Sequence, residues 1–426
     1  MGELPADRFD VAIVGAGLAG LTAALKLRED GLSVCVLEEA EDVGGRLQTE
    51  ERAGFLLDRG FQVFLTSYPE PRQWLDFPKL QLMRFVPGAL VRKDGQFHRF
   101  ADPWRRPSAL WSLLRSPVGT FADKLKIARM RRRVCRSTTE ALYETPDHTT
   151  IQALRGQGLS ESIIESFFRP FLGGVFLDHE LTTSSRLCDF VFRHFALGDA
   201  TLPSQGMQAI PRQLADKLLP EQLHLATPVG RLTDEGVMLA DGRRVESRIT
   251  LVATNAVSAQ AMLPKCDFEK RQRSVACLYF AADRPPVEEP ILILNGEGRG
   301  PVNNMCVPSQ VAPTYAPPGS SLISVTVLAT SSKHLVSLER EVRDQLKLWF
   351  GGDVLRWEHL KTDWIPEALP RQAAPALTPV VKPPQVSDRV FVCGDHRHTA
   401  SIQGAMESGR LAAQAITQKL RISVAS

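Results

Sequence analysis

The sequence lacks most of the features that mark secreted, membrane-spanning or nucleic-acid-binding proteins. Its seven cysteines are scattered and never spaced as Cys-x-x-Cys, which favours free thiols in a reducing compartment over a disulfide framework or a zinc site. No apolar run reaches the roughly eighteen residues of a transmembrane helix, and the first expected strand begins within about ten residues without a signal core. These absences together predict a cytoplasmic protein.

The sequence also has little excess of positive over negative charge. The formal net charge is only +3, which is too small to predict nucleic acid as a partner of the whole protein. The 426 residues exceed one ordinary hydrophobic core, so two structural units are expected.

The strongest signal that is present lies between Asp10 and Arg46. Val11–Val14 is a short apolar run, and leucines at helical spacing follow a glycine-rich turn, so the pattern predicts a strand, a tight turn and a helix. The turn consists of Gly15, Ala16, Gly17, Leu18, Ala19 and Gly20. Its first glycine permits the bend, its second lets a pyrophosphate approach the backbone, and its third lets the helix pack closely on the strand. A dinucleotide is the expected ligand.

An acidic residue and a second glycine motif follow at the spacing that a dinucleotide site requires. Glu38 ends the next apolar run, with Glu39 beside it, where a carboxylate can bind a ribose hydroxyl. Gly44-Gly45-Arg46 comes next. This order resembles the flavin-containing amine oxidoreductases, a family that also holds the protoporphyrinogen oxidases and carotenoid desaturases. In that family the Gly-Gly-Arg segment meets the diphosphate of FAD, so the resemblance implies FAD and not NAD.

The resemblance implies further cofactor contacts along the chain. An aromatic-glycine strand after Arg46 passes close to the isoalloxazine ring in the family, and a later residue touches adenine through its backbone. A strand near the C-terminus ends in Gly-Asp before a helix whose N-terminus faces the pyrimidine end of the flavin, where a helix dipole stabilises negative charge. The matching positions here are Gly60, Phe61, Gln62, Val229, Gly394, Asp395, Ile402, Gln403 and Ala405.

Aromatic residues in the middle of the chain suggest where a substrate binds. Four phenylalanines surround a proline and a glycine pair between residues 167 and 176, and they either line an apolar pocket or belong to the core. The segment 364–370 resembles a Trp-x-x-Ala-x-Pro signature of the protoporphyrinogen oxidase and desaturase branch, although a proline turn also explains it. The expected pocket residues are Phe61, Phe168, Phe171, Phe176 and Trp364.

Catalytic residues are hard to assign from the sequence. His396 and His398 flank Arg397 in the loop before the last helix, and either histidine is a candidate general acid or base because its ordinary pKa lies near neutral pH. Trp364 is a third candidate. Contact with cofactor, substrate or solvent explains the two histidines better than a metal site does, and no metal is expected.

Residues 99–136 are strongly basic and carry aromatic side chains. Eleven basic residues stand against two acidic ones, interleaved with apolar residues at a spacing that permits an amphipathic helical face. Such a face could rest on anionic lipid as a peripheral membrane contact. A solvated helix whose charges keep it soluble is the other interpretation.

The sequence therefore predicts an α/β fold with a discontinuous FAD-binding domain of the glutathione-reductase type, a Rossmann fold, carrying an inserted α+β substrate domain. The expected boundaries are 1–68, 202–265 and 380–426 for the FAD domain, and 69–201 and 266–379 for the substrate domain.

The expected function is an FAD-dependent oxidoreductase that removes hydride equivalents from a C–H bond of a bulky apolar small molecule, such as a polyene or a tetrapyrrole. Oxygen, a quinone or another carrier would accept the electrons. An amine oxidase is the second hypothesis, although the aromatic cage and the lysine near the flavin that such enzymes usually present cannot be placed here. A redox-neutral isomerase or a non-catalytic flavoprotein is the third.

Overall fold

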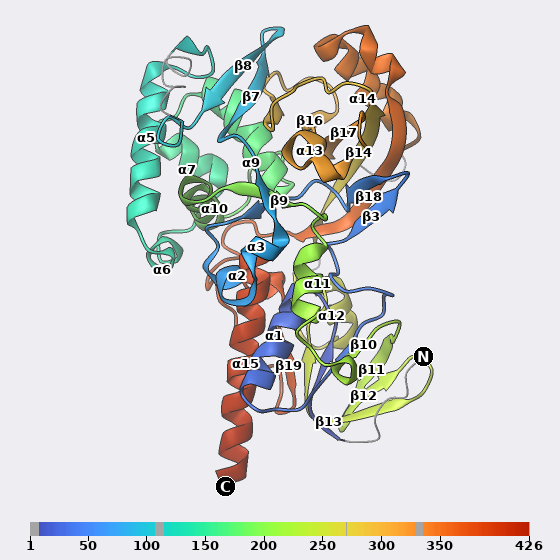
Figure 1. Ribbon diagram of the computed structural model, residues 1–426. Coiled ribbons are helices and arrows are strands. Elements are labelled where there is room, and N and C mark those ends of the chain that lie inside the picture. Colours follow the sequence, from blue (N-terminus) through green and yellow to red (C-terminus); the bar gives the residue numbers. More distant parts are fainter. Residues whose placement is uncertain (1–7, 107–114, 270, 329–334, 426) are drawn as a thin grey trace.

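A computed structural model describes residues 8–106, 115–269, 271–328 and 335–425 of the chain. Two seven-stranded sheets organise these residues, and they lie in the lower and the upper part of the molecule in Figure 1. Both ends of the chain lie in the lower part, where the first and last helices run side by side. None of the described helices is long and apolar enough to cross a membrane.

The lower sheet is the expected dinucleotide sheet. Its parallel centre pairs β1 with β2 on one side and with β13 on the other, and β19 joins β13 from the far end of the chain. The strand order is β10 (Leu223–His224), β2 (Val34–Leu37), β1 (Phe9–Val14), β13 (Arg244–Val252), β12 (Gly236–Leu239) and β11 (Val229–Thr233), with β19 (Val390–Val392) beside β13. Strands β11, β12 and β13 form an antiparallel meander at one side of this sheet. Continuous burial of β1 and β2 is typical of parallel strands covered on both faces.

Four helices belong to this lower part. They are α1 (Leu18–Glu29), α11 (Ala209–Ala215), α12 (Ala256–Met262) and α15 (Ile402–Ala425). Helices α1 and α15 pack closely because Gly409 has no side chain, and a Cβ there would lie 2.1 Å from the carbonyl oxygen of Ala19. This close approach joins the first helix of the chain to the last one.

The upper sheet is largely antiparallel. Its order is β18 (Glu358–Pro370), β14 (Gln272–Ala282), β17 (Ser321–Leu328), β16 (Val302–Cys306), β15 (Leu292–Asn295), β7 (Gly88–Lys93) and β8 (Gln96–Ala101). One hydrophobic cluster buries this sheet against α14 (Leu335–Phe350), which presents an apolar stripe.

Helices form a group beside the upper sheet (Figure 1). They are α5 (Phe121–Arg136), α6 (Thr139–Tyr143), α7 (Thr150–Gly156), α8 (Glu161–Ile163), a π-helical turn (Ile164–Phe168), α9 (Arg169–Phe176) and α10 (Ser185–Leu197). Smaller elements connect the two parts: β3 (Thr49–Arg52), β4 (Phe55–Asp58), β5 (Phe64–Leu65), α2 (Pro69–Trp74), α3 (Phe77–Leu80), β6 (Leu82–Arg84), β9 (Ala200–Pro203) and α13 (Pro308–Val311).

The structure rules out one of the two interpretations of segment 364–370. A proline turn was the alternative to a family signature, but the segment lies inside the long strand β18. This strand is at the edge of its sheet, where prolines remove fewer ladder hydrogen bonds than in a central strand. The domain boundaries themselves remain a prediction.

Candidate active site

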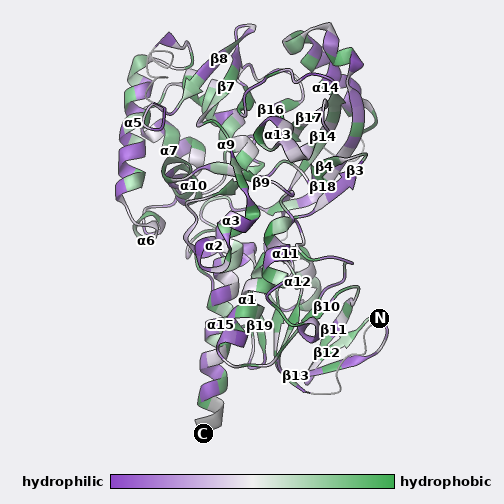
Figure 2. Cartoon of the chain, in the orientation of Figure 1, coloured by the Kyte–Doolittle hydropathy of each residue, from purple (hydrophilic) through white to green (hydrophobic). Residues whose placement is uncertain are grey.

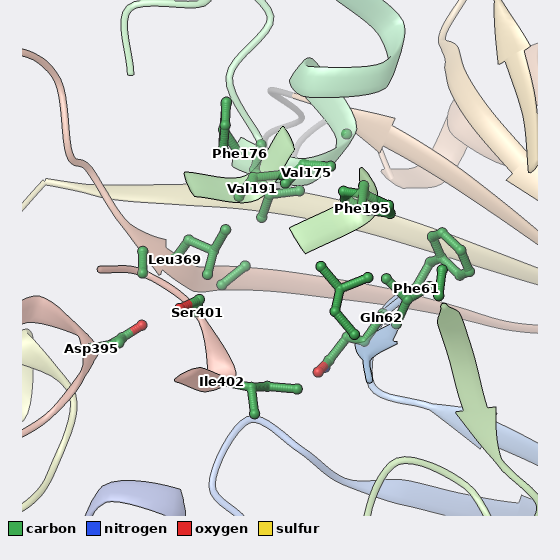
Figure 3. Close-up of a pocket in the computed structure, with 18 of the residues that line it drawn as sticks. Phe61, Gln62, Val175, Phe176, Val191, Phe195, Leu369, Asp395, Ser401 and Ile402 are labelled. Atoms are coloured by element: carbon green, nitrogen blue, oxygen red, sulfur yellow. The ribbon is translucent and has the colours of Figure 1, made fainter. Parts of the chain in front are cut away.

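A large cavity lies between the two sheets. Its volume is about 1110 Å³, above the roughly 300–1,000 Å³ that one drug-sized ligand occupies. Glycines and carboxylates from the lower part line one end, and phenylalanines from the upper helices line the other. Figure 3 shows Val175, Phe176, Val191 and Phe195 on one side and Asp395, Ser401 and Ile402 on the opposite side. The cavity is large enough for a dinucleotide and a second molecule.

The glycine-rich turn has the geometry that a dinucleotide needs. Gly15 has a φ of +106°, which favours glycine, and its N–H donates to Leu37 O at 2.8 Å. A Cβ on Gly20 would lie 2.0 Å from Gly15 O, so the close approach of helix and strand requires glycine. A Cβ on Gly17 would meet no protein atom within 4 Å. Gly17 therefore faces open space at the N-terminus of α1, where phosphate groups bind.

Glu38 lies at the carboxyl end of β2 and is 8% exposed. Its Oε2 accepts a hydrogen bond from the N–H of Ala16 at 2.6 Å, and its Oε1 accepts one from the N–H of Ala40 at 3.0 Å. Both Glu38 and Glu39 line the cavity. The backbone thus fixes the Glu38 carboxylate at the edge of the sheet where a ribose is expected.

Arg46 connects three parts of the site. Its Nη2 lies 2.7 Å from Asp395 Oδ2, and its Nη1 donates to Ala368 O at 2.9 Å. The side-chain amide of Gln62 donates to Arg46 O at 3.0 Å. The opening Gly-Gly-Arg segment and the closing Gly-Asp segment of the chain therefore meet through an ion pair, as the FAD prediction requires.

The cavity wall includes most of the expected cofactor residues. Those that line it are Gly15, Gly17, Leu18, Ala19, Glu38, Glu39, Gly44, Gly45, Arg46, Gly60, Phe61, Gln62, Val229, Gly394, Asp395, Ile402 and Ala405. The open space at Gly17 and the helix N-terminus beside it fit the diphosphate of a dinucleotide, so the donor set fits FAD. Their individual roles remain predictions.

Three expected cofactor residues do not line the cavity. Ala16 lies behind the turn and donates its N–H to Glu38, and Gly20 packs on Gly15. The side chain of Gln403 points away, because its Oε1 accepts from the N–H of Glu70 at 2.8 Å and its Nε2 donates to Glu407 at 3.0 Å. These three residues support the site through packing and hydrogen bonds without lining the cavity.

The structure divides the aromatic residues that were expected to form the substrate pocket. Phe61, Phe171 and Phe176 line the cavity. Phe168, the last residue of the π-helical turn, does not line the cavity, because its side chain is fully buried in the core. Trp364 does not line the cavity either, whereas the five residues of β18 that follow it, 365–369, all do.

Several aromatic wall residues are absent from the list of expected pocket residues, although Phe167 belongs to the four phenylalanines that were considered as pocket or core. Phe167 stacks on Phe171 with ring centres 5.5 Å apart, and Phe195 meets Phe171 edge-on at 5.2 Å. Val191 and Phe195 lie on α10 at the i, i+4 spacing that places them on one face. That spacing was the available signal, but it could not show that the face borders a cavity.

The two histidines are not part of the cavity wall. The His396 ring packs edge-on against Phe268 at 5.6 Å, and neither of its nitrogens has a hydrogen-bond partner in the structure. His398 accepts from the N–H of Thr399 at 2.8 Å, and its Nε2 lies 3.4 Å from Glu407. Burial lowers the pKa of each histidine to about 4. Both are therefore neutral buried residues near the site, and the structure does not support a direct acid–base role for either.

The comparison with solved structures identifies the fold first. The structure of a putrescine oxidase with bound putrescine superimposes with a TM-score of 0.69 at 18% identity, covering 97% of this chain and 100% of that chain. At this low identity the likeness shows the fold alone. The fold is thus the α/β, Rossmann-type architecture expected from the sequence.

The family follows from the sequence comparison. The model of the family described as flavin containing amine oxidoreductase matches residues 18–417. The chain belongs to this family. Membership confirms the expected class, a flavin-dependent oxidoreductase with FAD as its cofactor.

The curated relatives match only part of this chain. Protoporphyrinogen oxidase 2 of Arabidopsis thaliana is 26% identical over 164 residues, which cover 38% of this chain and 32% of that protein. The 15-cis-phytoene desaturase of Narcissus pseudonarcissus is 28% identical over 182 residues, which cover 38% and 30%. Each match spans about a third of the relative's length.

Proposed function

We propose that the protein uses FAD to remove hydride equivalents from a C–H bond of a bulky apolar molecule. The observation that carries this proposal is that one large cavity joins a dinucleotide end to a phenylalanine-lined chamber. Relatives named for porphyrinogen oxidation and phytoene desaturation support a tetrapyrrole or a polyene as the substrate class.

Bound FAD supplies the hydride acceptor. The residues of the chain bind and orient the reactants. Glu38 and the N-terminus of α1 would hold the ribose and the diphosphate, and the N-terminus of α15 beside Ser401 would offer a partial positive charge to the bound flavin.

The opposite wall of the cavity positions the substrate. Phe167, Phe171 and Phe195 form a packed aromatic surface from two different elements, the helical segment 164–176 and α10. An apolar molecule held against this surface displaces water from the reacting carbon. Specificity would follow from the shape of this wall, because it offers few groups for hydrogen bonding.

An amine is the alternative substrate. Family membership allows it, but the described part of the cavity wall contains a single lysine, Lys124, and a single tyrosine, Tyr68. Lys124 lies on α5, at the outer edge of the molecule in Figure 1, and its Nζ donates to Ser116 O at 2.8 Å. This arrangement favours the apolar substrate over the amine.

The test is an anaerobic screen. The purified protein with FAD is mixed with a porphyrinogen, a polyene and a set of amines. The absorbance of the flavin at about 450 nm is followed, because reduction of the flavin bleaches it. Bleaching by a porphyrinogen or polyene supports the proposal, and bleaching by amines alone supports the alternative. A flavin that none of them reduces would favour an isomerase or a non-catalytic flavoprotein.

We also propose that the substrate enters from an anionic membrane surface. Trp104, Phe121 and Leu125 line the cavity and are 54%, 64% and 46% exposed, so the cavity opens beside α5. Arg129 and Arg132 are exposed on the same helix, which Figure 2 shows largely in the hydrophilic colour. Exposed aromatic residues flanked by basic ones are typical of surfaces that rest on anionic lipid.

Part of the expected membrane segment, residues 107–114, lies outside the described residues. The described part supports a direct experiment. Sedimentation with vesicles containing anionic lipid should carry the protein down at low salt and release it at high salt. Equal binding to neutral vesicles, or no binding at all, would contradict this surface.

A further inference from the structure

The strand β18 has an irregular stretch where it passes the cofactor end of the cavity. Its pairing with β14 shifts register between Leu369 and Ile365, which pair with Arg273 and Val275. Three residues of β18 therefore stand opposite one residue of β14. Bulges of this kind turn side chains and backbone out of the regular sheet. The bulge residues Pro366, Glu367 and Ala368 all line the cavity.

Two contacts tie this bulge to the lower sheet. Arg46 donates to Ala368 O, as described above. In the second contact, Asn255 Nδ2 donates to Glu367 Oε2 at 3.1 Å. Asn255 follows β13 at the carboxyl edge of the parallel sheet, which is the edge where dinucleotides bind. The bulge therefore spans the cofactor end and is held at two neighbouring residues.

The orientation of the Asn255 side chain is fixed by a second bond. Asn255 is the N-cap of α12, and its Oδ1 accepts from the N–H of Ser258 at 2.8 Å. The amide nitrogen must then face Glu367, because the amide oxygen is already engaged. A donor held in place by one helix thus meets a carboxylate carried by a strand 112 residues later in the chain.

We propose that Asn255 and Glu367 form a clasp that closes the β18 bulge over bound FAD and slows its release. Neither residue was expected at the cofactor site from the sequence. Both side chains are half-buried, and a hydrogen bond to a carboxylate in such a position is stronger than one in water. Opening the clasp leaves the Arg46 contact to Ala368 O as the other of the two contacts that hold the bulge. The inference rests on FAD binding in this cavity and does not depend on the substrate.

The chain offers a matched set of variants. Asn255→Asp keeps the helix cap, because aspartate is an equally good N-cap, but it places two carboxylates face to face. Glu367→Gln keeps an acceptor oxygen for Asn255. The double variant Asn255→Asp with Glu367→Gln exchanges donor and acceptor, so the hydrogen bond re-forms in the opposite direction with the wild-type net charge.

The measurement is the rate of FAD release after dilution, followed by the rise of free-flavin fluorescence. Unfolding of the apoprotein is followed separately by circular dichroism. We expect Asn255→Asp to release FAD about tenfold faster, with an unchanged apoprotein midpoint. Glu367→Gln and the double variant should stay within about threefold of the wild type.

The proposal is overturned if Asn255→Asp releases FAD at the wild-type rate, or if the double variant releases it as fast as the single one. A lower apoprotein midpoint in Asn255→Asp that explains the faster release would also overturn it. These rates can be measured whatever the substrate screen shows. A wild-type protein that takes up no FAD on reconstitution would refute the cofactor site and the clasp together.

Discussion

The two ends of the cavity are built in different ways. The cofactor end uses backbone groups, glycines and two short motifs, 15–20 and 44–46, whose geometry follows from local sequence. The substrate end uses side chains of Phe61, α9 and α10, which come together only through packing. A cofactor that many proteins share can be bound by a fixed motif, whereas a substrate surface must be free to vary.

The largest expected effect comes from the cofactor end. Gly17→Val should abolish FAD binding, with an affinity loss of at least about a hundredfold, because the new side chain enters the open space where the diphosphate belongs. The apoprotein should fold normally, since a Cβ at Gly17 meets no protein atom within 4 Å. Calorimetric titration with FAD measures the first effect and thermal unfolding the second.

Gly20→Val is the control for this prediction. Its Cβ would lie 2.0 Å from Gly15 O, so this variant should fail to fold. If Gly17→Val retained FAD, the diphosphate would have to lie elsewhere, and the contrast between the two ends would be lost.

The second prediction separates pocket from core at the substrate end. Phe168→Ala should cost about 3–5 kcal/mol of unfolding free energy, because the ring is completely buried. Phe171→Ala should cost less stability and raise the KM for an apolar substrate about tenfold, with the flavin spectrum unchanged. Denaturant unfolding and steady-state kinetics measure the two quantities. Equal effects of both variants on KM would contradict the division between wall and core.

The third prediction is that low pH decreases the stability of the folded protein through a histidine buried near the cofactor end. Burial lowers the pKa of His396 to about 4, whereas the unfolded chain has a pKa of 6.5. The unfolded state therefore binds a proton first, so stability is fully present above pH 6.5 and falls as the pH is lowered towards 4. The loss is up to about 3 kcal/mol for this residue. His398 has the same direction of shift for the same cause.

His396→Leu tests this assignment. The ring makes no hydrogen bond in the structure, so leucine should remove its titration at little cost in packing. Unfolding free energies measured at several pH values should show a shallower slope between pH 6.5 and 4 than in the wild type. An identical slope would mean that His396 is not the group responsible.

The smallest effect is expected at the cavity mouth. Arg129→Gln should weaken binding to anionic vesicles by about fivefold, which corresponds to about 1 kcal/mol for one basic residue near a lipid surface. FAD binding should not change, since Arg129 is exposed on α5 and does not line the cavity. Vesicle sedimentation at fixed salt measures the difference. A matched variant on another surface, Arg356→Gln, should have no effect on vesicle binding.

The sequence by itself determined the cofactor end. The Gly15 turn, Glu38 and the Gly44-Gly45-Arg46 segment are local motifs, and the structure places them as the spacing predicts because strand, turn and helix are decided by nearby residues. The Arg46–Asp395 ion pair was not predicted, since no local rule joins residues so far apart in the chain.

The tertiary structure alone decided which aromatic residues face the cavity, where the histidines point and how β18 crosses the cofactor end. Phe168 and Phe171 look alike in the sequence, but the π-helical turn and the packing of α9 on α10 put one in the core and one on the wall. His396 and His398 are polar in sequence and buried in the fold. The physical reason is that burial depends on contacts between elements distant in the chain, and the pattern within one element shows its apolar face but not what that face meets.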